Sequence, residues 1–331
     1  MDGQYGPGGT RPVMCGMVRH GTVALALALA SPVALAAPYE AQMYAAPDRA
    51  PDFADIEYAQ PQGKPLKLDI YLPQNEATDA GADVPPLVVL IHGGGWRIGS
   101  KEQFRHMAER FAEQGFAAIT IDYRLTDTAP FPAQLHDCKA AIRWARVHAK
   151  TYGWAPARIA VLGDSSGAQL AALAGLTGGV VEKTIGKTTL NIAGAPDDGP
   201  GLGSRIQAVV DFFGYTDFRV FSQGRVREPR SIPLFFAGSA KDKPDLAELA
   251  SPLLHVTPDA PPFFIGQGRA DAGMHIQSMD LVWALDKAKV PYSLYVVGGG
   301  GHGDDAFYRG DPLAPVFAFL RTTFNMESSA R

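Results

Sequence analysis

Cysteine is scarce in this sequence, which contains two in 331 residues, Cys15 and Cys138. The spacing of its cysteines and histidines matches no zinc site, and it has neither a phosphate-binding P-loop nor the Gly-x-Gly-x-x-Gly fingerprint of dinucleotide binding. We therefore expect no metal ion and no organic cofactor. Cys138 shares a helical stripe with Leu135, Ile142 and Ala145, which favours a place in the core over a role as a nucleophile.

A large excess of one charge is also absent. The chain carries 30 Lys and Arg against 34 Asp and Glu, a formal net charge of -4, with no long run of either sign. Proteins that bind nucleic acid mainly through its backbone present a basic face. The composition therefore argues against nucleic acid as the main partner, and it leaves the oligomeric state open.

No apolar run is long enough to cross a bilayer comfortably. The most apolar run is residues 22–37 (TVALALALASPVALAA), which follows Arg11 and Arg19 and is not followed by a basic stop signal. This pattern is typical of a signal peptide, here with cleavage after Ala36. We therefore expect a secreted or periplasmic protein without a stable membrane span, and the alternative is that the run is a loose helix of the folded domain.

Removal of residues 1–36 would leave one cysteine, so no internal disulfide is expected. The start of translation is open, because Met1, Met14 and Met17 all precede the apolar run. The remaining residues, 37–331, are long enough to bury a sizeable core.

Strand-like and helix-like patterns of apolar residues alternate along the chain and predict the fold. In KPLKLDIYLP, residues 64–73, every second residue is apolar, which predicts a half-exposed strand of an edge hairpin with Lys67, Asp69 and Tyr71 on the outer face. Short unbroken apolar runs predict strands covered on both faces. These runs are PPLVVLIH, FAAITIDY, RIAVLGDS, IQAVVDFF, PPFFIG and YSLYVV.

Helical stripes separate these runs, as parallel strands require. Four helices are predicted. The first follows Ser100, which forms a capping box with Gln103, and the second spans about 132–150. The third begins inside VLGDSSGAQLAAL, and the fourth carries the apolar stripe Ile276, Met279, Val282 and Trp283. The alternation indicates one α/β sheet layered between helices. Residues 191–204 read as a surface loop, and about 219–254 as a small lid-like insertion.

The pattern Gly-x-Ser-x-Gly surrounds Ser165 between a buried run and a helix of small residues. This is the strand–turn–helix context of a nucleophile elbow, in which Gly163 and Gly167 allow the two backbones to approach closely. A serine hydroxyl becomes a useful nucleophile when a base takes its proton. Ser165 is therefore the candidate nucleophile.

His302 is the candidate base, because it follows the last predicted strand in the loop GGGGHG. Asp271 follows the preceding strand and would orient the imidazole. Asp211, Asp217 and Asp304 are rival carboxylates. Apart from His92, the other histidines are predicted to lie in helices, on the surface, in the lid or a structural role, or in the signal peptide.

The loop HGGGWRIGS follows the strand LVVLIH and can expose successive backbone N–H groups. Gly94 and Gly95, with the N–H of Ser166, are the candidate oxyanion hole. His92 is expected to hold this loop by hydrogen bonding. Trp96 is a candidate wall of the substrate pocket, with ordinary core packing as its alternative.

Taken together these motifs resemble a known family. The segments HGGGW, DYRL, GDSSG, SPLLHVTPDAPPFFIGQGRAD and GGGGHG look like the α/β-hydrolase serine esterases of the hormone-sensitive-lipase-like and bacterial feruloyl or acetyl esterase type. The resemblance covers about residues 55–324. It implies an α/β-hydrolase fold, with Ser165, Asp271 and His302 as triad.

The resemblance departs from the family pattern near the acid, where Gln267–Gly268 replaces His–Gly and Ala272–Met274 replaces Pro-x-Val-Pro. Ser166 stands where the family usually has alanine, which matters little for a backbone N–H. The implied activity is hydrolysis of small-molecule or polysaccharide-linked carboxylic esters, such as acetyl or feruloyl esters. The alternatives are an arylformamidase-like amide hydrolase and a non-catalytic binding protein on the same fold.

Overall fold

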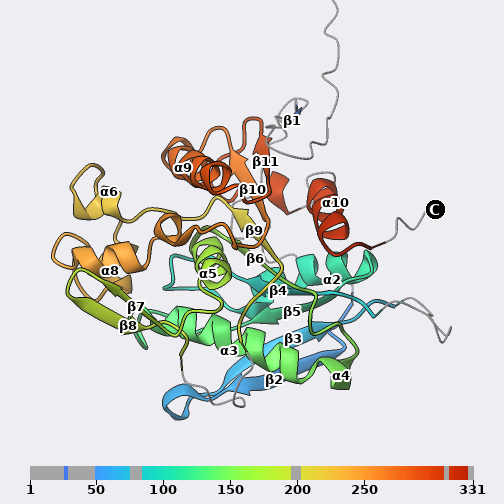
Figure 1. Cartoon of the computed structure of the whole chain (residues 1–331). Coiled ribbons are helices and arrows are strands. Elements are labelled where there is room, and N and C mark those ends of the chain that lie inside the picture. Colours follow the sequence, from blue (N-terminus) through green and yellow to red (C-terminus); the bar gives the residue numbers. More distant parts are fainter. Residues whose placement is uncertain (1–25, 29–48, 75–83, 195–202, 309–312, 327–331) are drawn as a thin grey trace, which may run out of the picture.

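The computed structural model describes residues 26–28, 49–74, 84–194, 203–308 and 313–326. Within them, one sheet of nine strands has the order β1-β11-β10-β9-β6-β4-β5-β3-β2 (Figure 1). Its strands are β1 (Ala26–Ala28), β2 (Phe53–Ala59), β3 (Leu66–Tyr71), β4 (Leu87–Ile91), β5 (Ala117–Ile121), β6 (Ile159–Asp164), β9 (Ala208–Phe212), β10 (Phe263–Gly268) and β11 (Tyr292–Val297).

The seven neighbouring strands β1, β11, β10, β9, β6, β4 and β5 are parallel. The strands β3 and β2 extend the sheet beyond β5 with antiparallel pairing. The six runs form the strands β4, β5, β6, β9, β10 and β11. The first five are buried along their whole length, as predicted, whereas β11 is only partly covered, with Ser293 exposed. The edge hairpin is confirmed as β2 and β3. β1 lies within the segment expected to be a signal peptide, and its backbone pairs with residues 295–297.

Helices cover both faces of the sheet (Figure 1). One apolar core includes residues of α3, α5 and α9, and the other includes residues of α2 and α10. The α-helices are α2 (Arg105–Glu113), α3 (Ala133–Val147), α4 (Ala149–Tyr152), α5 (Ser165–Leu176), α6 (Arg219–Ser222), α7 (Ser231–Phe235), α8 (Pro244–Leu249), α9 (Ala272–Ala288) and α10 (Ala314–Thr323). The 3₁₀ turns are η1 (Pro61–Gly63), η2 (Lys101–Phe104), η3 (Pro252–His255) and η4 (Asp305–Phe307).

Two segments interrupt the alternation of strands and helices. A hairpin of β7 (Glu182–Ile185) and β8 (Thr188–Asn191), which the sequence did not predict, precedes the expected surface loop. Residues 195–202 of that loop lie outside the described residues. The expected lid-like insertion consists of the short helices α6, α7 and α8 and the turn η3. Among the described residues, no helix combines the length and apolar character needed to span a membrane.

Two predictions about exposed faces were wrong. The prediction for the outer face of β3 is wrong at Asp69 and Tyr71, which are both fully buried under η2 and α2, while the Lys67 side chain is 44% exposed. In α9, Ile276 and Trp283 are 65% and 67% exposed, while Leu281 and the neighbouring Val282 are buried. The helix is apolar on more than one side, so its 3.6-residue period did not identify the inward face.

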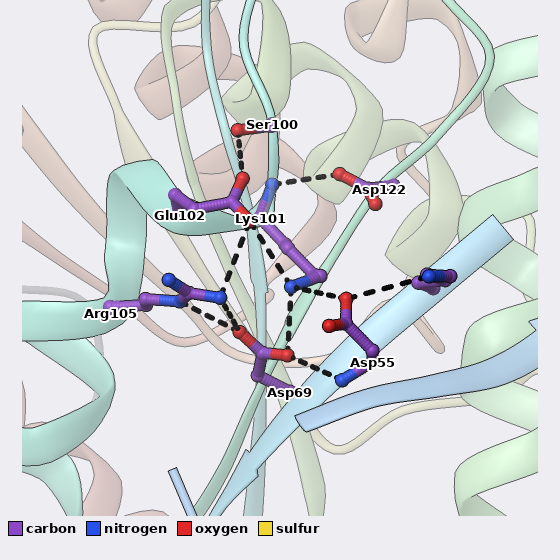
Figure 2. Close-up of polar contacts among 8 residues, drawn as sticks. Asp55, Asp69, Ser100, Lys101, Glu102, Arg105 and Asp122 are labelled. Atoms are coloured by element: carbon purple, nitrogen blue, oxygen red, sulfur yellow. Dashed lines mark hydrogen bonds and ion pairs between the residues drawn. The ribbon is translucent and has the colours of Figure 1, made fainter. Parts of the chain in front are cut away.

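Asp69 is buried within a cluster of charged side chains (Figure 2). Lys101 Nζ lies 2.8 Å from one carboxylate oxygen of Asp69, and Arg105 binds the other at 2.7 Å. Lys101 also pairs with Asp55 and Glu102, each at 3.2 Å. Opposite charges therefore surround each buried charge, which is the condition under which burial of ions is tolerated.

The cluster fixes the end of the glycine loop to the sheet. The backbone N–H of Lys101 donates to Asp122, which follows β5, at 2.9 Å, and the Ser100 hydroxyl donates to Glu102 (Figure 2). The predicted capping contact is present, because the Ser100 N–H donates to Gln103 Oε1 at 3.3 Å. Residues 92–100 are thus anchored where they join η2.

Replacement of Lys101 by Met tests this anchor. We expect Lys101→Met to lower the free energy of unfolding by about 3 kcal/mol, because it leaves part of the buried Asp69 charge uncompensated. The matched control is Lys67→Met, whose ammonium is 44% exposed and lies 3.8 Å from Asp55. Its effect is expected to stay within about 0.5 kcal/mol in urea denaturation. Equal effects of the two substitutions would show that the cluster does not act as an anchor.

Candidate active site

The central feature of the site is a sharp turn between β6 and α5. Ser165, the first residue of α5, has a φ of 49°, which is a strained conformation for a residue with a Cβ. A Cβ on Gly167 would lie 2.0 Å from the carbonyl oxygen of Ile91, and one on Gly163 would lie 2.3 Å from that of Gly167. No larger residue fits at either glycine, so the elbow context predicted from sequence is present.

The structure brings Ser165, His302 and Asp271 together. His302 Nε2 lies 2.9 Å from Ser165 Oγ, and His302 Nδ1 lies 2.7 Å from Asp271 Oδ2. Asp271 lies between β10 and α9, His302 follows β11, and Ser165 follows β6. All three residues therefore lie at the carboxyl ends of parallel strands. This is the arrangement in which an imidazole can accept a serine proton while a carboxylate orients the ring.

Two of the three rival carboxylates, Asp217 and Asp211, bond partners other than His302. Asp217 forms an ion pair with Arg219 at 2.8 Å, and Asp211 accepts the N–H of Gly214 at 2.8 Å. The backbone N–H of Asp304 donates to the carbonyl of residue 301. His255, which the sequence placed in the lid or in a structural role, bonds the carbonyl of residue 249 from a buried position.

The glycine loop lies directly beside the elbow. Gly94 and Gly95 have φ values of 107° and 62°, and the N–H groups of Arg97 and Ile98 both donate to the Gly94 carbonyl at 3.2 Å. A Cβ on Gly93 would lie 2.7 Å from a carboxylate oxygen of Asp164. Gly94 and Gly95, two of the three predicted oxyanion-hole residues, therefore belong to a compact turn that touches the residue before Ser165, and the third, Ser166, lies in the first turn of α5.

His92 holds this turn by hydrogen bonding, as expected from the sequence. Its Nδ1 lies 2.7 Å from the carbonyl oxygen of Gly93, and its ring stacks on Tyr123 at 4.3 Å between centroids. The Tyr123 hydroxyl donates to the His92 carbonyl at 2.9 Å. Burial lowers the pKa of His92 to about 4, so the ring is neutral at pH 7.

Trp96 is fully buried in this structure. Its ring stacks on Phe235 of α7 at 4.1 Å, and its Nε1–H donates to Gln169 of α5 at 3.1 Å. The Gln169 amide in turn donates to the carbonyl of Ala250 at 2.8 Å. Trp96 thus joins the glycine loop to α5 and to the lid-like insertion, and its role as a pocket wall stays a prediction.

A family model described as BD-FAE matches residues 68–285 of this chain. The chain belongs to the BD-FAE family. The match covers the glycine loop, the elbow and Asp271, and ends before the loop that carries His302.

Curated relatives of this family member are named as ester hydrolases. The probable carboxylic ester hydrolase LipM of Mycobacterium tuberculosis is 30% identical over 72% of this chain and 53% of its own length. Esterase LipQ of the same organism is 30% identical over 66% of this chain and 48% of its own length. The chain therefore spans about half the length of the curated relatives it matches.

Solved esterase structures share the fold over more of their length. A truncated carbohydrate esterase from gut microbiota has a TM-score of 0.71 and 29% identity, over 82% of this chain and 96% of its own. A thermophilic esterase of the Planctomycetes species Thermogutta terrifontis has a TM-score of 0.66 and 25% identity, over 84% and 94%. These similarities show that this BD-FAE chain has the α/β-hydrolase fold.

One buried pair at the site of this BD-FAE chain was missed by the sequence reasoning. Asp164, directly before Ser165, is fully buried and accepts the Tyr308 hydroxyl at 2.7 Å. Burial raises the pKa of Asp164 to about 6, against the opposing effects of the Tyr308 hydrogen bond and of His302. A carboxylate at the end of an otherwise apolar strand was a sequence signal that could have identified Asp164. Nothing local indicated its partner, because 144 residues separate Asp164 from Tyr308.

Among the residues that the structure describes, no group of three or more His, Cys, Asp and Glu side chains is arranged to hold a metal ion. The polar groups gathered around Ser165 are a hydroxyl, an imidazole, a carboxylate and the backbone of the glycine loop. Such a set can perform nucleophilic and acid–base chemistry with protein groups alone.

The neutral state of His92 predicts a pH effect on stability. Its pKa rises from about 4 in the folded state to 6.5 in the unfolded chain, so its contribution is present above pH 6.5 and is lost as the pH falls toward 4. The non-titrating variant His92→Asn lacks this contribution. We expect the free energy of unfolding of the wild type, relative to the variant, to be about 3 kcal/mol larger at pH 8 than at pH 4. A difference that stays constant between these pH values would contradict a neutral, buried His92.

Proposed function

We propose that this protein is an exported serine carboxylesterase that hydrolyses small acyl or aromatic esters of the acetyl or feruloyl type. The observation that carries the proposal is the chain of contacts from Ser165 through His302 to Asp271, at 2.9 and 2.7 Å. Membership of the BD-FAE family and the names of the relatives support carboxylic ester hydrolysis as the reaction class.

In the proposed reaction Ser165 Oγ attacks the ester carbonyl carbon while His302 Nε2 takes the hydroxyl proton. Asp271 accepts the Nδ1–H, which fixes the tautomer and stabilises the imidazolium that forms. His302 then gives the proton to the departing alcohol oxygen, and an acyl-enzyme remains. Water attacks this ester with His302 again as base, which releases the carboxylic acid and restores Ser165.

The negative charge on the carbonyl oxygen needs hydrogen-bond donors during both steps. In this proposal the donors are the backbone N–H groups of Gly94, Gly95 and Ser166. Two features support them: the glycine loop touches the elbow through Gly93 and Asp164, and Ser166 lies in the first turn of α5, where helix N–H groups have no partner within the helix.

The substrate class rests on neighbours and on the insertion. One similar structure is that of a carbohydrate esterase, and structures of the Thermogutta terrifontis esterase hold propionate or butyrate. These similar proteins support short acyl groups, with a small molecule or a polysaccharide as the alcohol part. Trp96 of the glycine loop packs with Phe235 of the lid-like insertion and with Phe218 directly before it, and the three rings are fully buried, so they form an aromatic layer that joins the loop to the insertion.

The first test is hydrolysis of a chromogenic aryl acetate by the purified protein. Ser165→Ala is expected to lower kcat/KM by about four to six orders of magnitude, as loss of a triad nucleophile does. Ser222→Ala, the same change on the lid-like insertion, should leave the rate at the wild-type level. A phosphonylating inhibitor should modify the peptide at Ser165 rather than at Ser166, as read by mass spectrometry.

The same assay separates the alternative functions. Faster turnover of an aryl formamide than of the matched aryl formate or acetate would favour an arylformamidase-like hydrolase. Equal, slow rates for the wild type and Ser165→Ala would reject the esterase proposal, and a non-catalytic binding protein would then fit better.

Export is proposed from residues 1–36 and has its own test. Expression of the full chain in a secreting bacterium should give a mature protein that begins at Ala37, as measured by intact mass. Cleavage there would remove β1, so a recombinant chain that begins at Ala37 should fold and keep the esterase activity without this edge strand. Ala34→Asp, which alters the small-x-small site, should block processing. A secreted or cytoplasmic product that retains residues 26–28 would contradict the proposal.

A further inference from the structure

His302 lies in a loop that gives its side chain little support. Four glycines, residues 298–301, precede it and Gly303 follows, and the φ values of Gly299 and Gly303 are 76° and 71°. The imidazole is 38% exposed. Glycines carry no side chain that could restrict the ring and give the backbone wide freedom. The orientation of His302 must therefore depend on groups outside its own loop.

Phe213 is such a group. Its ring centroid lies 4.9 Å from that of the imidazole, at an interplanar angle of 63°, in the edge-to-face arrangement that aromatic pairs prefer. On another side the ring packs against Phe307 of η4 at 4.8 Å and 69°. Phe213 is fully buried. It thus lies between the imidazole and the turn that follows the histidine loop.

The backbone at Phe213 is held in an unusual conformation. Its φ is 46°, in a region that bulky residues rarely occupy because it is strained. Its N–H donates to the Gly266 carbonyl of β10 at 2.9 Å. Next to it, Asp211 Oδ1 accepts the Gly214 N–H at 2.8 Å and closes the turn. Two hydrogen bonds therefore fix the direction in which the ring projects.

The same turn contacts the helix that carries the nucleophile. A Cβ on Gly214 would lie 2.8 Å from the Cβ of Ala168 and 3.0 Å from the backbone nitrogen of Gln169, both in α5. The turn after β9 is therefore packed tightly against the helix that begins at Ser165, while its aromatic ring contacts His302. The turn therefore contacts both the helix of Ser165 and the ring of His302, two parts of the site that come from different segments of the chain.

We propose that Phe213 is a positioning residue for His302, holding the imidazole in line between Ser165 and Asp271. The inference rests on the proposed function, in which His302 is the base. Proton transfer from Ser165 requires the ring within hydrogen-bond distance and in the correct orientation. Loss of the aromatic contact should therefore lower the rate of the chemical steps more than the binding of substrate.

The test compares Phe213→Leu and Phe213→Met with Phe264→Leu. Phe264, on β10, is equally buried in the same core, and its ring contacts Phe212, Tyr295 and Phe319. With an aryl acetate, both Phe213 variants should lose about 10- to 100-fold in kcat with KM within about twofold of wild type. Phe264→Leu should keep the wild-type kcat although it removes the same ring.

A proton NMR measurement separates positioning from a general loss of stability. The downfield signal of the Nδ1–H proton between His302 and Asp271 should broaden or disappear in folded Phe213→Leu and persist in Phe264→Leu. Equal kcat losses in the Phe213 and Phe264 variants, or an unchanged signal with wild-type kcat, would overturn the inference. The variant His302→Ala separates the two proposals. Wild-type activity in His302→Ala would refute the proposed function itself. An inactive His302→Ala together with a fully active Phe213→Leu would refute only the positioning role of Phe213.

Discussion

Close contact between the backbones of β4, β6 and α5 is the constraint on which the rest of the site depends. Glycine at positions 163 and 167 lets the helix start directly against the strand ends, with the Ile91 carbonyl 2.0 Å from where a Cβ of Gly167 would stand. The contact forces Ser165 into a strained turn and places the glycine loop beside it. A strained conformation of this kind persists only where the surrounding structure over-determines it.

The parts of the site are supported in different ways. The glycine loop is held at both ends, by the neutral ring of His92 and by the buried charges around Lys101, and in its middle by the Trp96–Gln169 hydrogen bond. The backbone of the His302 loop is held by the hydrogen bond from the Ala270 N–H to the Gly300 carbonyl, and the His302 side chain is held by partners from other elements. In the proposed mechanism, the supports of the glycine loop would hold the oxyanion donors in place, and the partners of His302 would orient the proposed base.

Much of the fold could be predicted from sequence because unbroken apolar runs identify strands covered on both faces. All six such runs form parallel strands, and the elbow lies where its pattern placed it. Burial of Asp69 could not be predicted, because it depends on Lys101 and Arg105 approaching from another element. The inward face of α9 was likewise ambiguous, since apolar residues such as Ile276 occur on more than one side of the helix.

The sequence by itself determined the order of strands and helices along the chain and the candidates for nucleophile, base and glycine loop, because periodicity and local motifs depend on neighbouring residues. Only the tertiary structure decided that Asp271, and not Asp211, bonds His302, that Asp164 pairs with Tyr308, and that Phe213 contacts the imidazole. These contacts join segments far apart in the chain. They depend on how strands stack side by side and on where each side chain points, which no local pattern of residues specifies.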